Sequence, residues 1–245
     1  MGNRLLADWA KQHTSKVDAV PSTIDLARYP TKPPEQAAKP VTLGWTGSHS
    51  TLPFLAMLHD TLNRLAATHE FRLLVISHRD DYPLDSAPFE VVAKRWNSTT
   101  EATDLHEIDI GLGPFPNSGW TPWRCHGKVL QYMAVGIPCV TSPIGILPEY
   151  VRDGENGLLA ADPSQWLEKL SLLINNADLR RRIGLAGRDT IEQRYSVDAW
   201  LPKIRQILES AVDTRPPRNR KRPRLSQSER APVPLEPNRG TKCRC

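Results

Sequence analysis

The sequence has few cysteines and no long hydrophobic run. Four cysteines in 245 residues do not make the disulfide framework of a small secreted domain, and the seven histidines do not cluster around them as zinc ligands would. No apolar stretch approaches the roughly 18 residues that a membrane-spanning helix needs. The N-terminal MGNRLLADWAKQHT has the pattern of an amphipathic helix rather than of a signal peptide. We therefore predict a cytoplasmic protein that needs no metal.

An excess of basic over acidic residues is missing from most of the chain, although the net charge is +5. Residues 213–245 contain ten Lys or Arg and three Asp or Glu, a net charge of +7, so residues 1–212 carry 5 − 7 = −2. This disfavours nucleic-acid binding by the body of the chain. The tail is rich in Pro and Arg and poor in large apolar residues, which predicts disorder. Its RNRKRPR run is more typical of a solvated charge run than of a polyanion-binding patch, which remains the alternative.

Several catalytic and cofactor motifs are also absent. The dinucleotide-binding pattern G-x-G-x-x-G does not occur, and the second predicted strand ends in Ser77, His78 and Arg79 rather than in an acidic ribose ligand. An NAD-type oxidoreductase is therefore disfavoured. Cys125 and His126 are neighbours in the sequence and would point in different directions on a helix, so they do not form a nucleophile and base pair.

What the sequence does contain is a regular alternation of strands and helices. Apolar runs predict strands at residues 41–45, 71–77, 89–96, 108–112, 137–141 and 157–160, and helical periodicity predicts helices at residues 52–68, 125–135, 147–151, 163–175, 178–195 and 197–212. This order predicts an α/β fold: a Rossmann-like parallel sheet of about six strands with helices on both faces, spanning residues 41–212.

The first forty residues have a different character. Residues 3–13 predict a helix, residues 16–20 a short strand, and residues 21–40 contain five prolines, as an interdomain linker does. One helix and one strand are too little for a domain. We interpret residues 1–40 as the remnant of an N-terminal domain followed by its linker.

The predicted strand–helix–strand unit at residues 108–141 contains the best candidate site. Loops at the carboxyl ends of parallel strands bind ligands, and this loop leads into a helix expected to begin at Cys125. Arg124 and Lys128 would add two cations to the positive end of the helix dipole, which suits a diphosphate leaving group. Gln131 could bond vicinal hydroxyls or cap a backbone group. Gly47 and Ser48, after the first strand, could approach an anion, although a tight turn would also need glycine.

Three sequence blocks in this order carry a resemblance to a known family: KVLQYMAVGIPCVTSPIG, EYVRDGENGLLA and WLEKLSLLINNADLRRRIGLAGRDTIEQRYS. Together they resemble the C-terminal, donor-binding domain of the retaining GT-B glycosyltransferases of family four, the glycosyl transferases group 1. The resemblance implies a nucleotide-sugar donor of the UDP or GDP type, no metal, and electrostatic stabilisation of the leaving diphosphate. Two glutamates eight residues apart are common in the family, and Trp123 and Gln131 stand at their positions.

Carried over by position, the resemblance implies roles for eight residues. Lys128 and Arg124 would stabilise the leaving group. The other six would bind the nucleotide, with Gly47 and Ser48 near the phosphates and Gln131 at the ribose. Trp96, Ile144 and Gly145 would flank the nucleotide. We expect a glycosyltransferase donor domain that is incomplete without an acceptor domain. The alternative is a non-catalytic nucleotide-sugar-binding module that acts with a partner chain.

Overall fold

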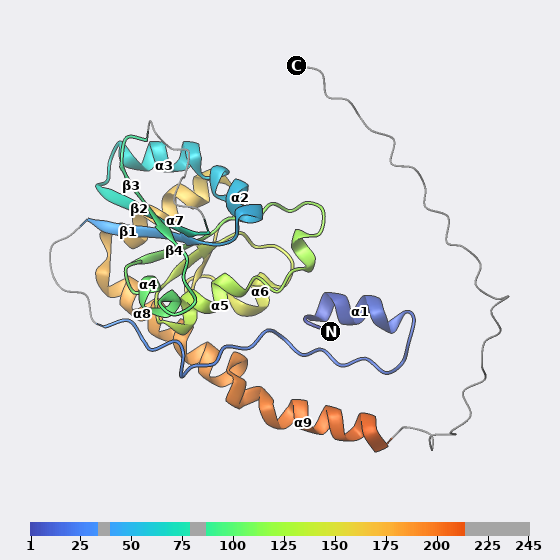
Figure 1. Ribbon diagram of the computed structural model, residues 1–245. Coiled ribbons are helices and arrows are strands. Elements are labelled where there is room, and N and C mark those ends of the chain that lie inside the picture. Colours follow the sequence, from blue (N-terminus) through green and yellow to red (C-terminus); the bar gives the residue numbers. More distant parts are fainter. Residues whose placement is uncertain (34–39, 79–86, 214–245) are drawn as a thin grey trace. The chain divides into compact units, whose positions relative to one another are not determined.

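The computed structural model describes residues 1–33, 40–78 and 87–213 (Figure 1). The predicted tail therefore lies outside the described residues, apart from Asp213. The chain divides into two compact units, Met1–Leu208 and Glu209–Cys245, and the second is described only where it contains the end of α9. In chain order the elements are α1 (Arg4–Lys11), β1 (Val41–Thr46), η1 (His49–Thr51), α2 (Leu52–Ala56), α3 (His59–Ala66), β2 (Phe71–Ser77), β3 (Glu90–Arg95), α4 (Glu101–Leu105), β4 (Ile110–Gly113), η2 (Thr121–Trp123), α5 (Gly127–Ala134), β5 (Cys139–Thr141), α6 (Leu147–Tyr150), β6 (Leu158–Leu159), α7 (Pro163–Asn175), α8 (Ala177–Thr190), η3 (Ile191–Tyr195) and α9 (Val197–Asp213).

The six described strands form one parallel sheet in the order β3-β2-β1-β4-β5-β6. This is the strand order of a Rossmann-like fold, and it confirms the predicted α/β class. The order reverses direction between β1 and β4, so their carboxyl ends diverge into a crevice. In open parallel sheets, ligands bind at this switch point. From the fold alone, we therefore expect a ligand site at the loops that follow β1 and β4.

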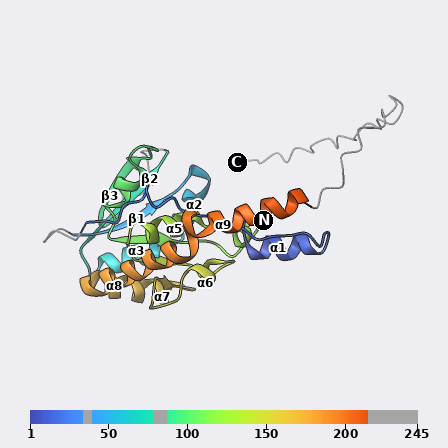
Figure 2. The ribbon, with the colours of Figure 1, turned by 90° about the horizontal axis from the view of Figure 1, so that it is seen from below.

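Alternating side chains of the buried strands face two apolar cores. On one face Leu43 and Trp45 of β1 pack with leucines of α3 and α7. On the other face lies α5, with α8 packed against it (Figures 1 and 2). The leucines predicted to mark one helix face at residues 52–68 do face the core, and Leu62 and Leu65 are 1% and 0% exposed. Each fully buried leucine stabilises the fold by about 1.5–3 kcal/mol.

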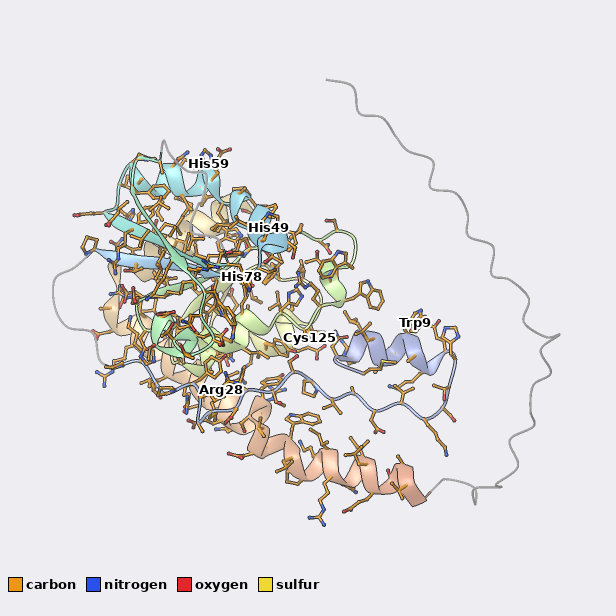
Figure 3. The ribbon with its side chains drawn as sticks, viewed as in Figure 1. Trp9, Arg28, His49, His59, His78 and Cys125 are labelled. Carbon is orange, nitrogen blue, oxygen red and sulfur yellow. The ribbon has the colours of Figure 1, made fainter. Side chains whose placement is uncertain are left out.

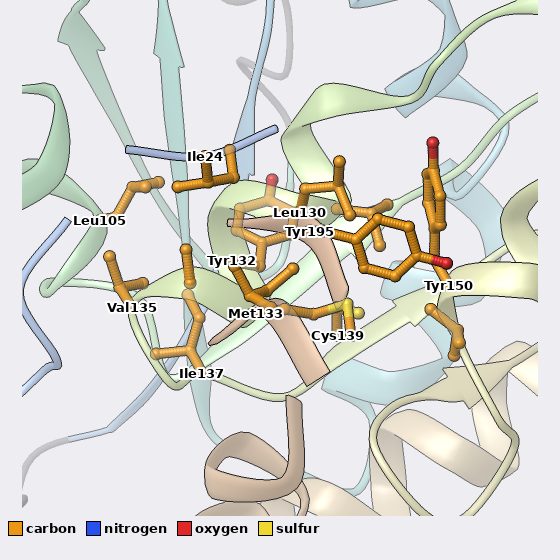
Figure 4. Close-up of a cluster of buried hydrophobic side chains, with 14 of the residues drawn as sticks. Ile24, Leu105, Leu130, Tyr132, Met133, Val135, Ile137, Cys139, Tyr150 and Tyr195 are labelled. Atoms are coloured by element: carbon orange, nitrogen blue, oxygen red, sulfur yellow. The ribbon is translucent and has the colours of Figure 1, made fainter. Parts of the chain in front are cut away.

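Tyr132 joins α5 to the sheet at the centre of the second core (Figure 4). Its ring is fully buried, and its hydroxyl accepts a hydrogen bond from the Thr46 amide at 3.0 Å. The same hydroxyl lies 3.3 Å from the Leu112 carbonyl oxygen, to which it donates. The ring therefore fixes the position of α5 relative to β1 and β4, the two strands at the switch point.

The N-terminal segment, residues 1–33, packs on the same unit. The Ile24 amide donates to the Tyr195 carbonyl oxygen at 2.8 Å, and the Ile24 carbonyl oxygen accepts from the Val197 amide at 2.9 Å. The Lys32 ammonium forms an ion pair with Asp109, a carboxylate that is 1% exposed. Asp109 also accepts from the Thr42 amide at 2.8 Å. The stretch predicted to be a linker is therefore docked to the sheet through the part of it that the structure describes.

Four predicted elements differ from the observed ones, and the first is the helix predicted at residues 178–195, which ends at Thr190 and continues as the π-helical η3. The strand predicted at residues 16–20 is absent: these residues pair with none of the described strands, and the Val20 amide donates to the Met1 carbonyl oxygen at 2.8 Å. The single helix predicted for residues 52–68 is two helices, because Leu58 has φ −93° and ψ 0° and ends the helical conformation. The central helix begins at Gly127 rather than Cys125.

No helix within the described residues combines the length and the apolar character that crossing a membrane requires.

Candidate functional site

A cavity of about 260 Å³ opens where the carboxyl ends of β1 to β4 meet the start of α5. It approaches the lower end of the size range of small-molecule sites, roughly 300 Å³. Six of the eight predicted site residues line this cavity, which we call the switch-point pocket. They are Gly47, Ser48, Trp96, Arg124, Lys128 and Gln131, and the lining also includes Thr46, Thr51, His78, Glu101, Phe115, His126 and Gly127.

Lys128 brings an ammonium group to the pocket without a partner to neutralise it. Its Nζ is buried and lacks a hydrogen-bond partner among the described residues. The atom rests 4.0 Å from the ring centroid of Trp45 and 5.5 Å from that of Phe115. Burial, with a smaller contribution from the nearby Arg124 charge, lowers the pKa of Lys128 to about 7. A buried cation that lacks a partner is costly to a fold, so this group indicates a binding function.

Arg124 and His126 line the pocket beside Lys128, and both precede α5, although the predicted helix included His126. His126 adopts a left-handed conformation, with φ 48° and ψ 44°, which prevents the helix from starting before Gly127. Arg124 is therefore extended and off the helix. Its guanidinium stacks 4.2 Å from the Trp120 ring centroid, and its Nη1 is buried without a partner among the described residues.

His126 is a pocket residue that the sequence did not single out. It is 4% exposed, and both ring nitrogens lack hydrogen-bond partners within the described chain. Burial, followed by the charges of Arg124 and Lys128, lowers the pKa of His126 to about 4, so the ring is neutral at pH 7. Cys125 and His126 were expected to diverge on a helix, but both precede α5. The Cys125 thiol donates to the Gly2 carbonyl oxygen at 3.3 Å, beside α1 (Figure 3).

Gly47 lines the pocket where there is no room for a side chain. A Cβ at this position would lie 2.6 Å from the Trp45 ring and 2.8 Å from Lys128 Nζ. Glycine is thus required because the lysine head and its aromatic support pack directly on the backbone. Ser48 follows, and its hydroxyl lies 3.0 Å from that of Ser50. Their approach to phosphates stays a prediction.

Trp96 and Gln131 meet at the Glu101 carboxylate, and we call these three pocket residues the carboxylate wall. The Trp96 indole donates to Glu101 Oε1 at 2.9 Å, and its ring lies tilted against His78, with centroids 5.2 Å apart. Gln131 donates from Nε2 to the same Glu101 oxygen at 3.1 Å and to the Tyr29 hydroxyl at 2.9 Å. Sequence reasoning missed Glu101 and Tyr29, because nothing local marks a carboxylate on one short helix and a tyrosine of a linker as neighbours.

Ile144 and Gly145 lie outside the switch-point pocket. Ile144 lines a neighbouring cavity of about 300 Å³ that shares the Phe115 ring with the first. Gly145 has φ +56°, and a Cβ there would lie 2.1 Å from the Pro122 carbonyl oxygen. It supports the loop that carries Arg124, and its predicted contact with a nucleotide stays a prediction.

The described residues hold no group of three or more His, Cys, Asp or Glu side chains that could bind a metal ion. Lys128 and Arg124 bring two basic side chains to the pocket, and Glu101 brings a hydrogen-bonded carboxylate. A ligand with a polyanionic part and a polar, hydroxyl-bearing part would complement both.

Comparison with known proteins identifies the family. The sequence profile of the family described as "Glycosyl transferases group 1" matches residues 41–176, which is more than half of the chain. This chain belongs to the glycosyl transferases group 1. The match begins at the first residue of β1 and ends just after α7, so this group 1 domain coincides with the sheet and the pocket.

Relatives of this group 1 domain agree with that assignment. An uncharacterised glycosyltransferase of Methanocaldococcus jannaschii is 35% identical over 86 residues, which cover 34% of this chain and 24% of that protein. The matches to two further relatives cover 18% of each, so the chain spans a quarter or less of these relatives.

Solved structures share the fold of this group 1 domain. The C-terminal domain of a glycosyl transferase group 1 protein from Francisella tularensis has a TM-score of 0.56 and 18% identity, covering 71% of this chain and 99% of that one. Anabaena HepE, in complex with UDP and glucose, has a TM-score of 0.61 and 16% identity, covering 79% of this chain and 56% of HepE. The chain therefore has the fold of GT-B C-terminal domains.

Proposed function

We propose that the switch-point pocket binds a nucleotide-diphosphate sugar of the UDP or GDP type as the donor in a retaining hexosyl transfer. The observation that carries the proposal is the buried ammonium of Lys128, which lacks a partner among the described residues and lies at the sheet's switch point. Family membership supports glycosyl transfer, and the HepE complex with UDP and glucose supports this choice of ligand.

In this proposal, Lys128 and Arg124 act on the leaving group. When the bond from the sugar to the diphosphate breaks, negative charge grows on the diphosphate oxygens. Two cations already held in place stabilise that charge with little reorganisation, which is the main source of catalysis in such sites. The neutral His126 ring can add a hydrogen bond, since one of its nitrogens carries a proton at pH 7.

The proposal covers the donor half of the reaction. The chain spans 56% of the length of HepE. We place the acceptor site on residues outside the Rossmann-like domain, either in the same polypeptide or in a partner chain. With the latter arrangement the chain would act as a nucleotide-sugar-binding module and need its partner for transfer.

Calorimetric titration with UDP, GDP, UDP-glucose and GDP-mannose tests the site. We expect one of the two nucleotide classes to bind, and Lys128→Met to weaken it by about tenfold to a hundredfold, the value of a hydrogen bond to a charged group. Lys203→Met is the matched control, because Lys203 also lies over a tryptophan, 4.7 Å from the Trp200 ring centroid, but on α9. The assignment is wrong if no nucleotide binds, or if both variants bind as the wild type does.

A further inference from the structure

A closed hydrogen-bond network surrounds Gln131 on the carboxylate wall of the pocket. The Tyr29 hydroxyl donates to Glu101 Oε2 at 2.7 Å, and Trp96 Nε1 donates to Glu101 Oε1 at 2.9 Å. Gln131 Nε2 completes the network with its two bonds, to the Tyr29 oxygen and to Glu101 Oε1. The four side chains come from the N-terminal segment, the end of β3, α4 and α5.

Donors and acceptors in this network can be assigned in one way only. A carboxylate accepts and does not donate, and the indole N–H only donates, so both bonds of Trp96 and Tyr29 to Glu101 point toward the carboxylate. Tyr29 keeps its proton because burial and the adjacent Glu101 raise its pKa to about 12. Its oxygen can then accept only from Gln131. The two protons of the Gln131 amide nitrogen are therefore both used by the protein.

The Gln131 amide oxygen, Oε1, is the polar atom of this side chain that the network does not use. Gln131 lines the pocket and forms no hydrogen bond through Oε1 within the described chain. Gln131 also lies three residues after Lys128 on α5, so the two side chains share a helix face toward the pocket. A glutamine ordinarily offers a donor and an acceptor. In this setting it offers a ligand only an acceptor, as a carboxylate would, but without the negative charge.

We infer that Tyr29 and Glu101 are positioning residues that fix the Gln131 amide as an acceptor for a ribose hydroxyl of the donor nucleotide. The inference rests on the proposed function, since it requires a nucleotide in the pocket. It assigns a role to the N-terminal segment: Tyr29, which precedes the sheet by more than ten residues, completes the support of the site. It also explains why a glutamine, rather than a glutamate, can act as the acceptor beside Glu101: a second carboxylate there would be repelled by the first.

Binding of UDP and GDP, each compared with its 2′-deoxy and 3′-deoxy forms, tests this inference. For the wild type we expect a preference of about fivefold to tenfold for the ribonucleotide over one of the deoxy forms, the contribution of one hydrogen bond. Tyr29→Phe keeps the ring and removes the hydroxyl, so one proton of the Gln131 amide loses its acceptor and Glu101 alone holds the amide. We expect this variant to lower the preference to about twofold or less while leaving the affinity for the deoxy form unchanged.

A second variant and a control complete the experiment. Gln131→Glu places two carboxylates side by side, and we expect it to weaken both nucleotide forms. Tyr150→Phe is the matched control, because the Tyr150 hydroxyl is buried without a partner among the described residues and lies outside the pocket.

The outcomes separate the possibilities. Equal weakening of the ribo and deoxy forms by Tyr29→Phe, or an unchanged preference, would show a purely structural network and overturn the inference while the proposed function stands. Absence of nucleotide binding by the wild type would overturn the proposed function and this inference with it.

Discussion

Nucleotide affinity should fall steeply between pH 7 and pH 9 because of Lys128. In the empty pocket the pKa of this lysine is lowered to about 7, first by burial and then by the Arg124 charge. A bound diphosphate supplies the missing negative charge and returns the pKa toward the ordinary value of about 10.4. Binding above pH 7 must therefore take up a proton.

The size of the effect follows from the fraction of Lys128 that is charged before binding. With a pKa of about 7, that fraction is roughly one half at pH 7 and roughly one hundredth at pH 9, so the affinity should fall by about 50-fold. His126 does not contribute, since its pKa of about 4 keeps it neutral throughout this range. The phosphate groups of UDP do not contribute either, because their last proton is lost near pH 6.

Calorimetry at pH 7, 8 and 9, in pairs of buffers with different ionisation enthalpies, measures both the affinity and the protons taken up. We expect uptake of nearly one proton per UDP or GDP at pH 8. Lys128→Met should bind weakly with little pH dependence, whereas Lys203→Met should follow the wild type. A flat affinity for the wild type, or an equal slope for Lys128→Met, would refute the assignment of the buried cation to the ligand.

The same lysine should make the empty protein less stable. Its folded-state pKa is lowered, so between pH 7 and pH 10 the unfolded chain binds more protons and stability rises with pH through this window. A difference of about three pKa units corresponds to at most about 4 kcal/mol near pH 7. Lys128→Met should therefore raise the free energy of unfolding at pH 7 while it weakens nucleotide binding, and urea denaturation would measure the gain.

Two further predictions concern the support of the site. Lys32→Ala should lower the free energy of unfolding by about 3 kcal/mol, because the buried Asp109 would lose its ion pair with Lys32. The control Lys11→Ala breaks an exposed ion pair and should cost less than about 1 kcal/mol. Urea denaturation measures both. Gly145→Ala should cost about 3 kcal/mol, because its Cβ would collide with the Pro122 carbonyl oxygen. Gly119→Ala has nearly the same φ but open space around it, so a similar loss there would contradict the argument from the collision.

The sequence predicted those elements whose signals are local. Helix α7 was predicted at its observed bounds, because Asp162 caps it with bonds to the Ser164 and Gln165 amides and proline stands at its first position. The strands were predicted from apolar runs, since a parallel sheet buries both faces. The start of α5 was not, because a left-handed His126 has no sequence signal of its own.

The candidate site could be predicted only in part. Arg124, Lys128 and Gln131 are close in the sequence, and the family resemblance named them together. Glu101 and Tyr29 come from separate segments that meet only when β3, α4 and the N-terminal segment pack. Such tertiary neighbours leave no periodic pattern, which is why the support that they give to Gln131 emerged only from the structure.

The Tyr29 hydroxyl couples the docking of the N-terminal segment to ligand binding in the pocket. If Tyr29 holds Gln131 in the form that accepts a ribose hydroxyl, then by thermodynamic reciprocity a bound nucleotide must hold Tyr29 in place with the same free energy. The docking of residues 21–33 and the occupancy of the pocket then form one coupled equilibrium. The Ile24 amide, which donates to the Tyr195 carbonyl oxygen, should therefore exchange its hydrogen more slowly when a nucleotide is bound next to Gln131 than when the pocket is empty.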